Sequence, residues 1–194
     1  YNKAVKLATG KYLVFTDDDI EVDPDWLKEL VKVIESDQLI GVAQPKILSM
    51  YDHRKIDFAG GIMDLFGLVH RRGYMTVDQG QYDKITDIFF GNNTAMMVRK
   101  SALDEVGLAF DPKLVFHLEN VDLCWRLWLN RRKVVFVPRS VVYHAGGGGK
   151  RMASFSKKMN FHSNKNRIII SLKYFNYSNL VKYVPLYLFL ILSY

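Results

Sequence analysis

The sequence has only one cysteine, Cys124, among its 194 residues. An internal disulfide and a cysteine-rich zinc site are therefore excluded, and a lone thiol is typical of a reducing compartment such as the cytosol. With 5 prolines and 13 glycines, the chain is not collagen-like. Its 49% hydrophobic and 24% charged residues argue against a disordered or wholly membrane-embedded chain, and its length suits one domain or part of one.

Acidic residues are absent after Asp122. Residues 123–194 carry 13 of the 27 Lys and Arg residues and no Asp or Glu. Aromatic residues alternate with this positive charge, a pattern that suits an anionic partner, either a phospholipid surface or nucleic acid. A solvated basic face is the plain alternative. Because no nucleic-acid-binding motif is recognisable, we expect a membrane surface and no nucleic acid.

A long hydrophobic run is also missing. Residues 184–194 are apolar, but they are fewer than the roughly 20 residues that a membrane-spanning helix needs, so they could form only part of such a span. Residues 1–10 begin without Met and show no signal-peptide pattern. We therefore expect the sequence to be an excised fragment of a longer protein.

Helical and strand patterns alternate along the first half of the chain. The continuous apolar run at 12–15 is typical of a parallel strand that is buried on both faces. A capping residue and an apolar repeat predict a helix from Asp23, and apolar segments predict strands over 40–48, 133–137 and 141–143. The predicted fold class is α/β with a mostly parallel, open sheet.

A cluster of acidic residues follows the first predicted strand. Side chains alternate along a strand, so Asp17 and Asp19 point to the same side, at the sheet edge where α/β proteins bind ligands. His144 ends a later predicted strand. Two carboxylates and an imidazole are suitable ligands for Mg²⁺ or Mn²⁺. The plain alternatives are an acidic loop that caps the next helix and a structural histidine.

A helix predicted over 118–129 carries the second group of candidate residues. Glu119, Asp122 and Arg126 are spaced by three and four residues and share one helix face. A carboxylate there could act as a general base, because a partly closed cleft raises its pKa toward neutrality. The alternative is a solvated helix face on which Asp122 pairs with Arg126, and the spacing does not separate the two.

These residues belong to an ordered series of segments. The segments are Ala8-x-Gly10-x-Tyr12, Phe15-x-Asp17-Asp18-Asp19, Asp23-Pro24-Asp25-Trp26-Leu27, Gly91 with Val98-Arg99-Lys100 and Phe110-Asp111, Glu119-Asn120-Val121-Asp122-Leu123-Cys124-Trp125-Arg126, and Val142-Tyr143-His144. Together they resemble the family 2 inverting glycosyltransferases, most closely the rhamnosyltransferase-type branch that builds surface polysaccharide. The resemblance implies a nucleotide-diphospho-sugar transferase (GT-A-like) fold that is truncated at its N-terminus. Residues 1–149 would then be the C-terminal two-thirds of the catalytic domain, and 150–194 a basic, aromatic, membrane-proximal helical segment.

The same resemblance implies roles for individual residues. Asp17 and Asp19 match the DxD motif that holds Mg²⁺ or Mn²⁺ on the donor diphosphate, and His144 matches a late histidine that reaches the metal or the diphosphate. The residues expected to bind the nucleotide sugar are Asp17, Asp18, Gly91, Asn92 and Arg126. The implied partners are a nucleotide-diphosphate sugar donor and a glycan or lipid-linked acceptor.

One residue departs from the family pattern. The family's base is usually the aspartate after the glutamate, and here that position is Asn120, whose amide cannot accept a proton as a general base. We expect Glu119 to be the base, with Asp122 as an assisting residue. The predicted function is inverting sugar transfer in cell-surface polysaccharide synthesis, at the cytoplasmic face of the membrane. The alternative is a catalytically impaired nucleotide-sugar-binding or scaffold protein.

Overall fold

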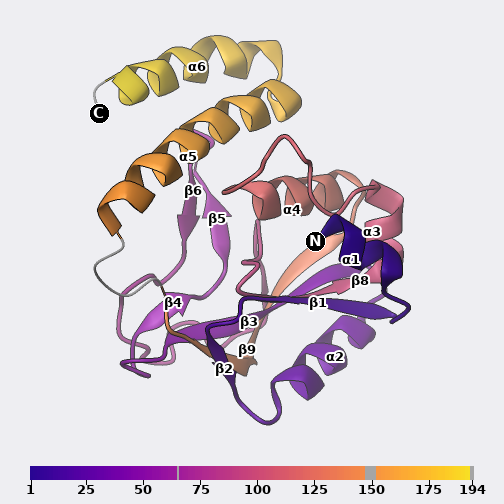
Figure 1. Ribbon diagram of the computed structural model, residues 1–194. Helices are drawn as coiled ribbons and strands as arrows, with labels where there is room; N and C mark the ends of the chain where they lie inside the picture. Colours follow the sequence, from indigo (N-terminus) through magenta and orange to yellow (C-terminus); the bar gives the residue numbers. More distant parts are fainter. Residues whose placement is uncertain (65, 147–151, 193–194) are drawn as a thin grey trace.

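The structure is a computed structural model that describes residues 1–64, 66–146 and 152–192. A central sheet, a small hairpin and flanking helices make up the molecule (Figure 1). The helices are α1 (Asn2–Leu7), α2 (Trp26–Ser36), α3 (Lys100–Val106), α4 (Glu119–Leu129), α5 (Met152–Tyr174) and α6 (Tyr177–Leu192). The strands are β1 (Tyr12–Thr16), β2 (Ile20–Val22), β3 (Ile40–Ser49), β4 (Ile56–Phe58), β5 (Gly61–Met63), β6 (Val69–Arg71), β7 (Thr86–Asp87), β8 (Ala95–Arg99) and β9 (Lys133–His144).

The sheet has the strand order β1-β8-β3-β9-β2, with β4 beside β3 and β7 beside β9. At its centre β3 and β9 are parallel, and their pairing runs from Ile40 opposite Lys133 to Ser49 opposite His144. The other pairings of the described strands are antiparallel. The α/β class is confirmed, but the sheet is more mixed than the sequence predicts. Parallel neighbours need a long crossover, usually helical, and the described chain has no helix between β3 and β8.

Strand β1 differs from the predicted parallel strand with two buried faces. It pairs antiparallel with β8 and stands at one end of the strand order. Its burial alternates, because Leu13 and Phe15 are buried while Val14 is 38% exposed. A short apolar run does not specify the direction of the neighbouring strand, so this part of the prediction was wrong.

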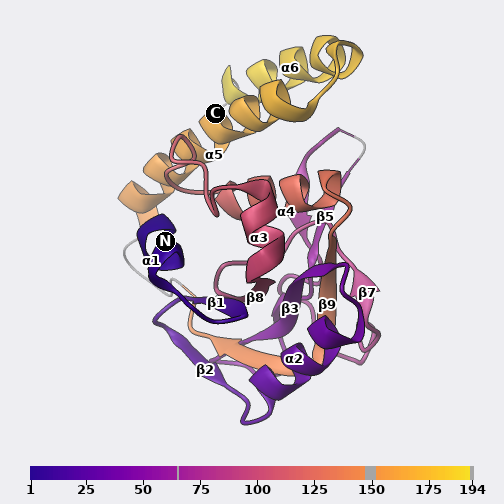
Figure 2. The ribbon, with the colours of Figure 1, turned by 90° about the vertical axis from the view of Figure 1, so that its right-hand side faces the viewer.

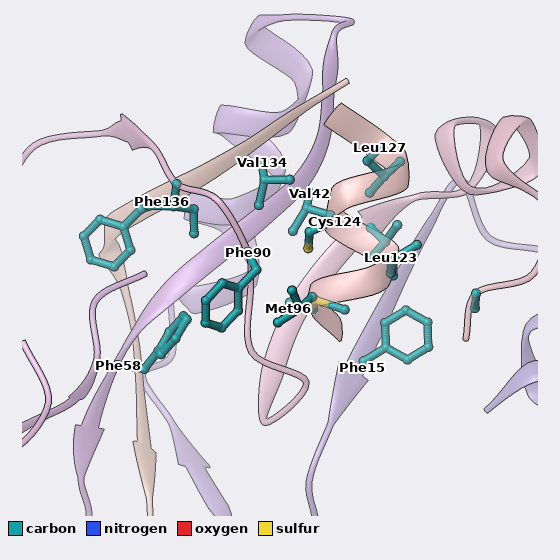
Figure 3. Close-up of a cluster of buried hydrophobic side chains, with 14 of the residues drawn as sticks. Phe15, Val42, Phe58, Phe90, Met96, Leu123, Cys124, Leu127, Val134 and Phe136 are labelled. Carbon is teal, nitrogen blue, oxygen red and sulfur yellow. The ribbon is translucent and has the colours of Figure 1, made fainter. Parts of the chain in front are cut away.

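The two faces of the sheet pack against different helices. Val42 joins the core that contains Cys124 of α4, whereas its neighbour Ala43 joins the core that contains Leu30 and Ile34 of α2. This division follows from the alternation of side chains along a strand. Figure 3 shows part of the first core, with Phe15, Val42, Phe58, Phe90, Met96, Leu123, Cys124, Leu127, Val134 and Phe136 labelled.

Two element boundaries differ from the prediction. Helix α2 begins at Trp26 rather than near Asp23, whose carboxylate instead accepts the Asp25 N–H at 3.0 Å. Strand β9 is continuous where the sequence predicts two strands, and its register against β3 shifts between Pro45 and Lys46. Both differences leave Asp17 directly after β1 and His144 at the end of β9, as predicted.

The C-terminal part is helical, as predicted. Helix α5 lies between α6 and the rest of the molecule, beside α4 and the β5-β6 hairpin (Figures 1 and 2). It buries Asn166 and Ile170, and α6 buries Tyr187, whose hydroxyl donates to the Phe66 carbonyl. No helix of the described chain is both long and apolar enough to cross a membrane. The expected boundary at 149/150 lies outside the described residues.

Candidate active site

Two carboxylates and an imidazole lie together where strands of the sheet end. Asp17 follows β1, and its N–H donates to the Thr94 carbonyl at 3.1 Å. Beyond Asp19 the chain enters β2, whose antiparallel pairing places Ile20 opposite His144 at the end of β9. One ligand atom from each of Asp17, Asp19 and His144 lies within 4.8 Å of the other two. The three side chains that were expected to meet at the sheet edge are therefore neighbours.

The chemistry of these three groups fits a hard divalent cation. Carboxylate oxygens are preferred ligands of Mg²⁺ and Mn²⁺, and Mn²⁺ also accepts an imidazole nitrogen. Ligands about 2.1 Å from a shared Mg²⁺ lie at most about 4.2 Å apart, so only a small inward movement would close the site. The Nε2 atom of His144 is already 3.5 Å from an Asp19 oxygen.

A third carboxylate, which the sequence reasoning missed, contacts His144 at the ring nitrogen that faces away from Asp19. Asp57 of β4 accepts a hydrogen bond from His144 Nδ1 at 2.7 Å, and its other oxygen accepts one from Arg71 at 3.0 Å. The strand pairing explains the contact, because β4 and β9 both flank the end of β3. The bond to Asp57 raises the pKa of His144 above its ordinary value, although burial opposes the shift.

A cavity of about 790 Å³ joins this cluster to the first turn of α4. Asp17 and His144 line it, as does Glu119, which is the first residue of α4. Other residues that line the cavity include Tyr1, Phe58, Phe90, Asn92, Asn93, Phe110, Asn120 and Arg167. One cavity is therefore lined by members of both groups of residues singled out in the sequence.

Of the two carboxylate oxygens of Glu119, one accepts a hydrogen bond and the other has no hydrogen-bond partner in the described chain. Its Oε1 accepts a hydrogen bond from Asn93 Nδ2 at 2.9 Å, while its Oε2 is buried without a hydrogen-bond partner in the described chain. Burial raises the pKa of Glu119, the charge of Asp17 adds to the shift, and the bond from Asn93 offsets only part of it. A carboxylate with a raised pKa and a free oxygen in a cavity can accept a proton from a bound hydroxyl.

The other residues expected to bind the donor have different positions. Asn92 lines the cavity, whereas Asp18 is exposed and is not part of the lining. Gly91 is buried, and a Cβ there would lie 2.9 Å from the Gln44 side chain, so this glycine permits close packing. Its carbonyl accepts the side-chain N–H of Asn120 at 2.6 Å. The amide at the family's base position thus has a structural partner.

Asp122 and Arg126 lie away from the cavity. Asp122 is fully buried, with one oxygen 2.9 Å from Arg126 Nε and the other bonded to Lys173 and Tyr174 of α5. Arg126 also donates to three main-chain carbonyls, one at the end of α3 and two in the loop that follows it. The structure therefore supports neither an assisting role for Asp122 nor donor binding by Arg126. Their spacing placed them correctly on α4, but it could not show that α5 covers this face.

Comparisons with known proteins add to this geometry. Residues 1–107 match the family described as "Glycosyl transferase family 2". The chain belongs to glycosyl transferase family 2. No curated protein matches it.

Two solved structures share the fold of this family 2 chain. "Crystal structure of GalNAc-T7 with UDP, GalNAc and Mn2+" matches with a TM-score of 0.64 and 19% identity, over 90% of this chain and 34% of that one. "Crystal structure of S. aureus TarS" matches with a TM-score of 0.50 and 16% identity, over 83% of this chain and 25% of that one. The GT-A-like fold is thereby confirmed, and the chain spans about a third or less of the length of these proteins.

The sequence reasoning also missed cationic and imidazole groups that line the cavity of the family 2 chain. Arg71, His117 and Arg167 belong to the lining. His117 has a left-handed backbone (φ 66°), and Asn166 of α5 donates to its carbonyl at 2.6 Å. Burial lowers the pKa of His117, and the charge of Arg71 adds to the effect. No local sequence pattern marks these residues, because contacts with distant segments place them here.

Proposed function

We propose that this chain carries a site that transfers a sugar from a nucleotide-diphosphate donor to a hydroxyl of a glycan or lipid-linked acceptor, with inversion at the anomeric carbon. The observation that carries the proposal is the single cavity lined by Asp17, His144 and Glu119. Membership of glycosyl transferase family 2 supports sugar transfer in general. Inversion, the type of acceptor and a role in cell-surface polysaccharide synthesis are parts of the proposal.

The side of the cavity at the strand ends suits the donor diphosphate. Asp17, Asp19 and His144 would hold Mg²⁺ or Mn²⁺ there. When bound, such an ion stabilises the negative charge that develops on a diphosphate leaving group. Asn92 lies in the lining of the same cavity and can hydrogen-bond the donor.

Glu119 suits the acceptor side of the reaction. An inverting displacement needs a base that removes the proton of the attacking hydroxyl. Glu119 lines this cavity, and its buried Oε2 has no hydrogen-bond partner in the described chain. The hydrogen bond from Asn93 fixes the other oxygen and so orients the carboxylate. Asn120 cannot take this role, since its amide is not a base and is bound to the Gly91 carbonyl.

Transfer assays with the full-length protein test the assignment. We expect Glu119→Gln to lower the rate of transfer by roughly 10²–10⁴-fold, since that is the usual contribution of a general base. Glu105→Gln is the matched control, because Glu105 is exposed and paired with Arg132 outside the cavity. EDTA is expected to abolish transfer until Mn²⁺ or Mg²⁺ is restored. Undiminished activity of Glu119→Gln, or of the EDTA-treated protein, would refute the respective role.

The transfer assays should include nucleotide-diphosphate hexoses and deoxyhexoses as candidate donors, because the sequence resembles the rhamnosyltransferase-type branch. Donor binding without transfer to any acceptor would favour the nucleotide-sugar-binding or scaffold role. In that case Asn120→Asp should restore little, because the new carboxylate would face the Gly91 carbonyl in place of a hydrogen bond.

We further propose that the C-terminal helices contact the cytoplasmic face of the membrane. Apolar and aromatic side chains of α5 and α6 are exposed, among them Phe161 (65%), Leu172 (62%) and Tyr177 (82%). No acidic residue follows Asp122, and each Lys or Arg near an anionic leaflet contributes about 1 kcal/mol. Lys173 is an exception, because it faces Asp111 and Asp122 within the protein.

Co-sedimentation with phosphatidylglycerol vesicles tests this contact, with phosphatidylcholine vesicles and an oligonucleotide as comparisons. We expect binding to the anionic vesicles alone, and weaker binding after Tyr177→Glu. Leu129→Glu is the matched control, since Leu129 is 64% exposed at the end of α4. Salt-dependent binding to the oligonucleotide but not to the vesicles would instead indicate a nucleic-acid partner.

A further inference from the structure

The environment of His144 is asymmetric. Its Nε2 faces the carboxylate of Asp19 at 3.5 Å, and its Nδ1 faces the carboxylate of Asp57 at 2.7 Å. The first contact is on the side of the candidate metal ligands, and the second is on β4. Only the second distance is that of a close hydrogen bond. The two ring nitrogens therefore have different hydrogen-bonding environments.

Asp57 is itself held in place by a second contact. Its Oδ1 accepts a hydrogen bond from Arg71 Nη1 at 3.0 Å, while Oδ2 accepts the one from His144. The guanidinium of Arg71 lies over the ring of Tyr74, 3.4 Å from its centroid. Both carboxylate oxygens are thus used, and the Asp57 side chain is only 15% exposed. In this orientation an amide at position 57 would have an oxygen at only one of the two acceptor positions and an NH₂ group at the other, so one of these two bonds would be lost.

We propose that Asp57 is the positioning residue of the metal site, and that Arg71 fixes Asp57 for this task. By accepting the Nδ1 proton, Asp57 selects the tautomer in which His144 Nε2 carries a lone pair directed toward Asp17 and Asp19. Arg71 holds the carboxylate from the β5-β6 hairpin, so this hairpin contributes to the orientation of a ligand on β9. The inference rests on the proposed function, because it concerns the same metal site.

Two measurements on the 194-residue chain test the inference. The first is the affinity for Mn²⁺ alone, from an electron paramagnetic resonance titration without donor or acceptor. Loss of an outer partner of a ligating histidine typically weakens metal binding 10–100-fold. We expect Asp57→Asn to weaken binding by about 10-fold or more, and Arg71→Gln to have a smaller effect in the same direction. The second measurement is ¹⁵N NMR of the His144 ring without metal. At a pH above the pKa of the imidazole, it should show the Nδ1–H tautomer in the wild type and a mixture in Asp57→Asn.

Asp64→Asn is the matched control. Asp64 pairs with His70 at 2.8 Å, so it makes the same kind of carboxylate–imidazole contact, but neither residue belongs to the metal cluster or lines the cavity. This variant should bind Mn²⁺ as the wild type does. Thermal melts of all variants separate a local effect from unfolding, and Arg71→Gln provides a second test because the Arg71 side chain is 42% exposed.

The outcomes distinguish the inference from the proposed function. If the wild type binds Mn²⁺ while Asp57→Asn and Arg71→Gln bind it equally well and keep the Nδ1–H tautomer, the positioning role is overturned and the metal site stands. If the wild type does not bind Mn²⁺, the metal part of the proposed function fails. The tautomer measurement then still decides whether Asp57 orients the ring.

Discussion

Replacing Asp122 tests the view that this carboxylate stabilises the protein rather than acting in catalysis. Asp122 is fully buried, 2.9 Å from Arg126 Nε and bonded to Lys173 and to the Tyr174 hydroxyl, which is 2.6 Å away. Burial lowers the pKa of Lys173, but its contacts with Asp122 and Asp111 outweigh this effect, so the net shift is upward. Arg126 and Lys173 would both lose a carboxylate partner if Asp122 were replaced.

The expected magnitude follows from these contacts. Removing one partner of a buried ion pair costs about 3–5 kcal/mol. The side chains of Arg126 and Lys173 are 18% and 31% exposed, so water can reach both cations after Asp122→Ala. We therefore expect the free energy of unfolding to fall by about 3 kcal/mol, at the lower end of the range. For a chain of this size, that corresponds to a melting temperature lower by ~6–12 °C.

Urea unfolding followed by circular dichroism, together with thermal melts, measures the loss. Asp104→Ala is the matched control, because Asp104 forms a surface pair with Lys100 at 3.3 Å and is 61% exposed. Such a pair contributes about 0.5 kcal/mol or less. A loss for Asp122→Ala as small as that of the control would refute the reasoning. If Asp122→Asn stays folded but loses sugar transfer as completely as Glu119→Gln, Asp122 belongs to the catalytic machinery after all.

Three further predictions concern single side chains. Because the pKa of Glu119 is raised above 4.5, the native state binds its proton more tightly than the unfolded chain, so stability falls as pH rises through this window. Glu119→Gln should therefore have a higher melting temperature than the wild type at neutral pH. A pH series of melts should show this difference becoming smaller as the pH falls. A difference that grows on acidification would contradict a raised pKa of Glu119. Asn166→Ala removes donors to the carbonyls of Phe116 and His117, at 2.7 and 2.6 Å. It should cost about 2 kcal/mol and speed hydrogen exchange at 116–118; unchanged exchange would show that other contacts hold the loop. Burial raises the pKa of Cys124 to about 12, so the thiol should react with a disulfide reagent only after unfolding, and fast labelling of the native protein would disprove its burial.

The ends of the strands could be predicted from the sequence, and with them the meeting of Asp17, Asp19 and His144. A strand pattern shows where a strand stops, and ligand sites of α/β proteins lie at such ends. The direction of β1 could not be predicted, because its apolar run is compatible with a parallel or an antiparallel neighbour. The α/β class was therefore predictable, and the mixed pairing of the sheet was not.

Contacts between distant segments explain what the sequence did not show at the site. Asp57 and His144 are hydrogen-bonded although they are 87 positions apart in the sequence, and Lys173 and Asp122 are hydrogen-bonded across a separation of 51 positions. Helical spacing correctly placed Asp122 and Arg126 on one face of α4, but spacing does not tell which element packs against that face. The sequence reasoning did not single out Asn93, although this residue directly follows the predicted Gly91-Asn92 pair. Its side-chain amide donates a hydrogen bond to Glu119.

The bonds that α5 makes have a consequence for how the protein can be divided. Asn166, Lys173 and Tyr174 all donate to groups that precede residue 123. A polypeptide that ended before α5 would keep the Asp122 carboxylate but lose two of its donors, and the loop before α4 would lose the amide that holds its carbonyls. Separate expression of the part before α5 should therefore yield a poorly folding product, whereas supplying α5 as a synthetic peptide should restore it.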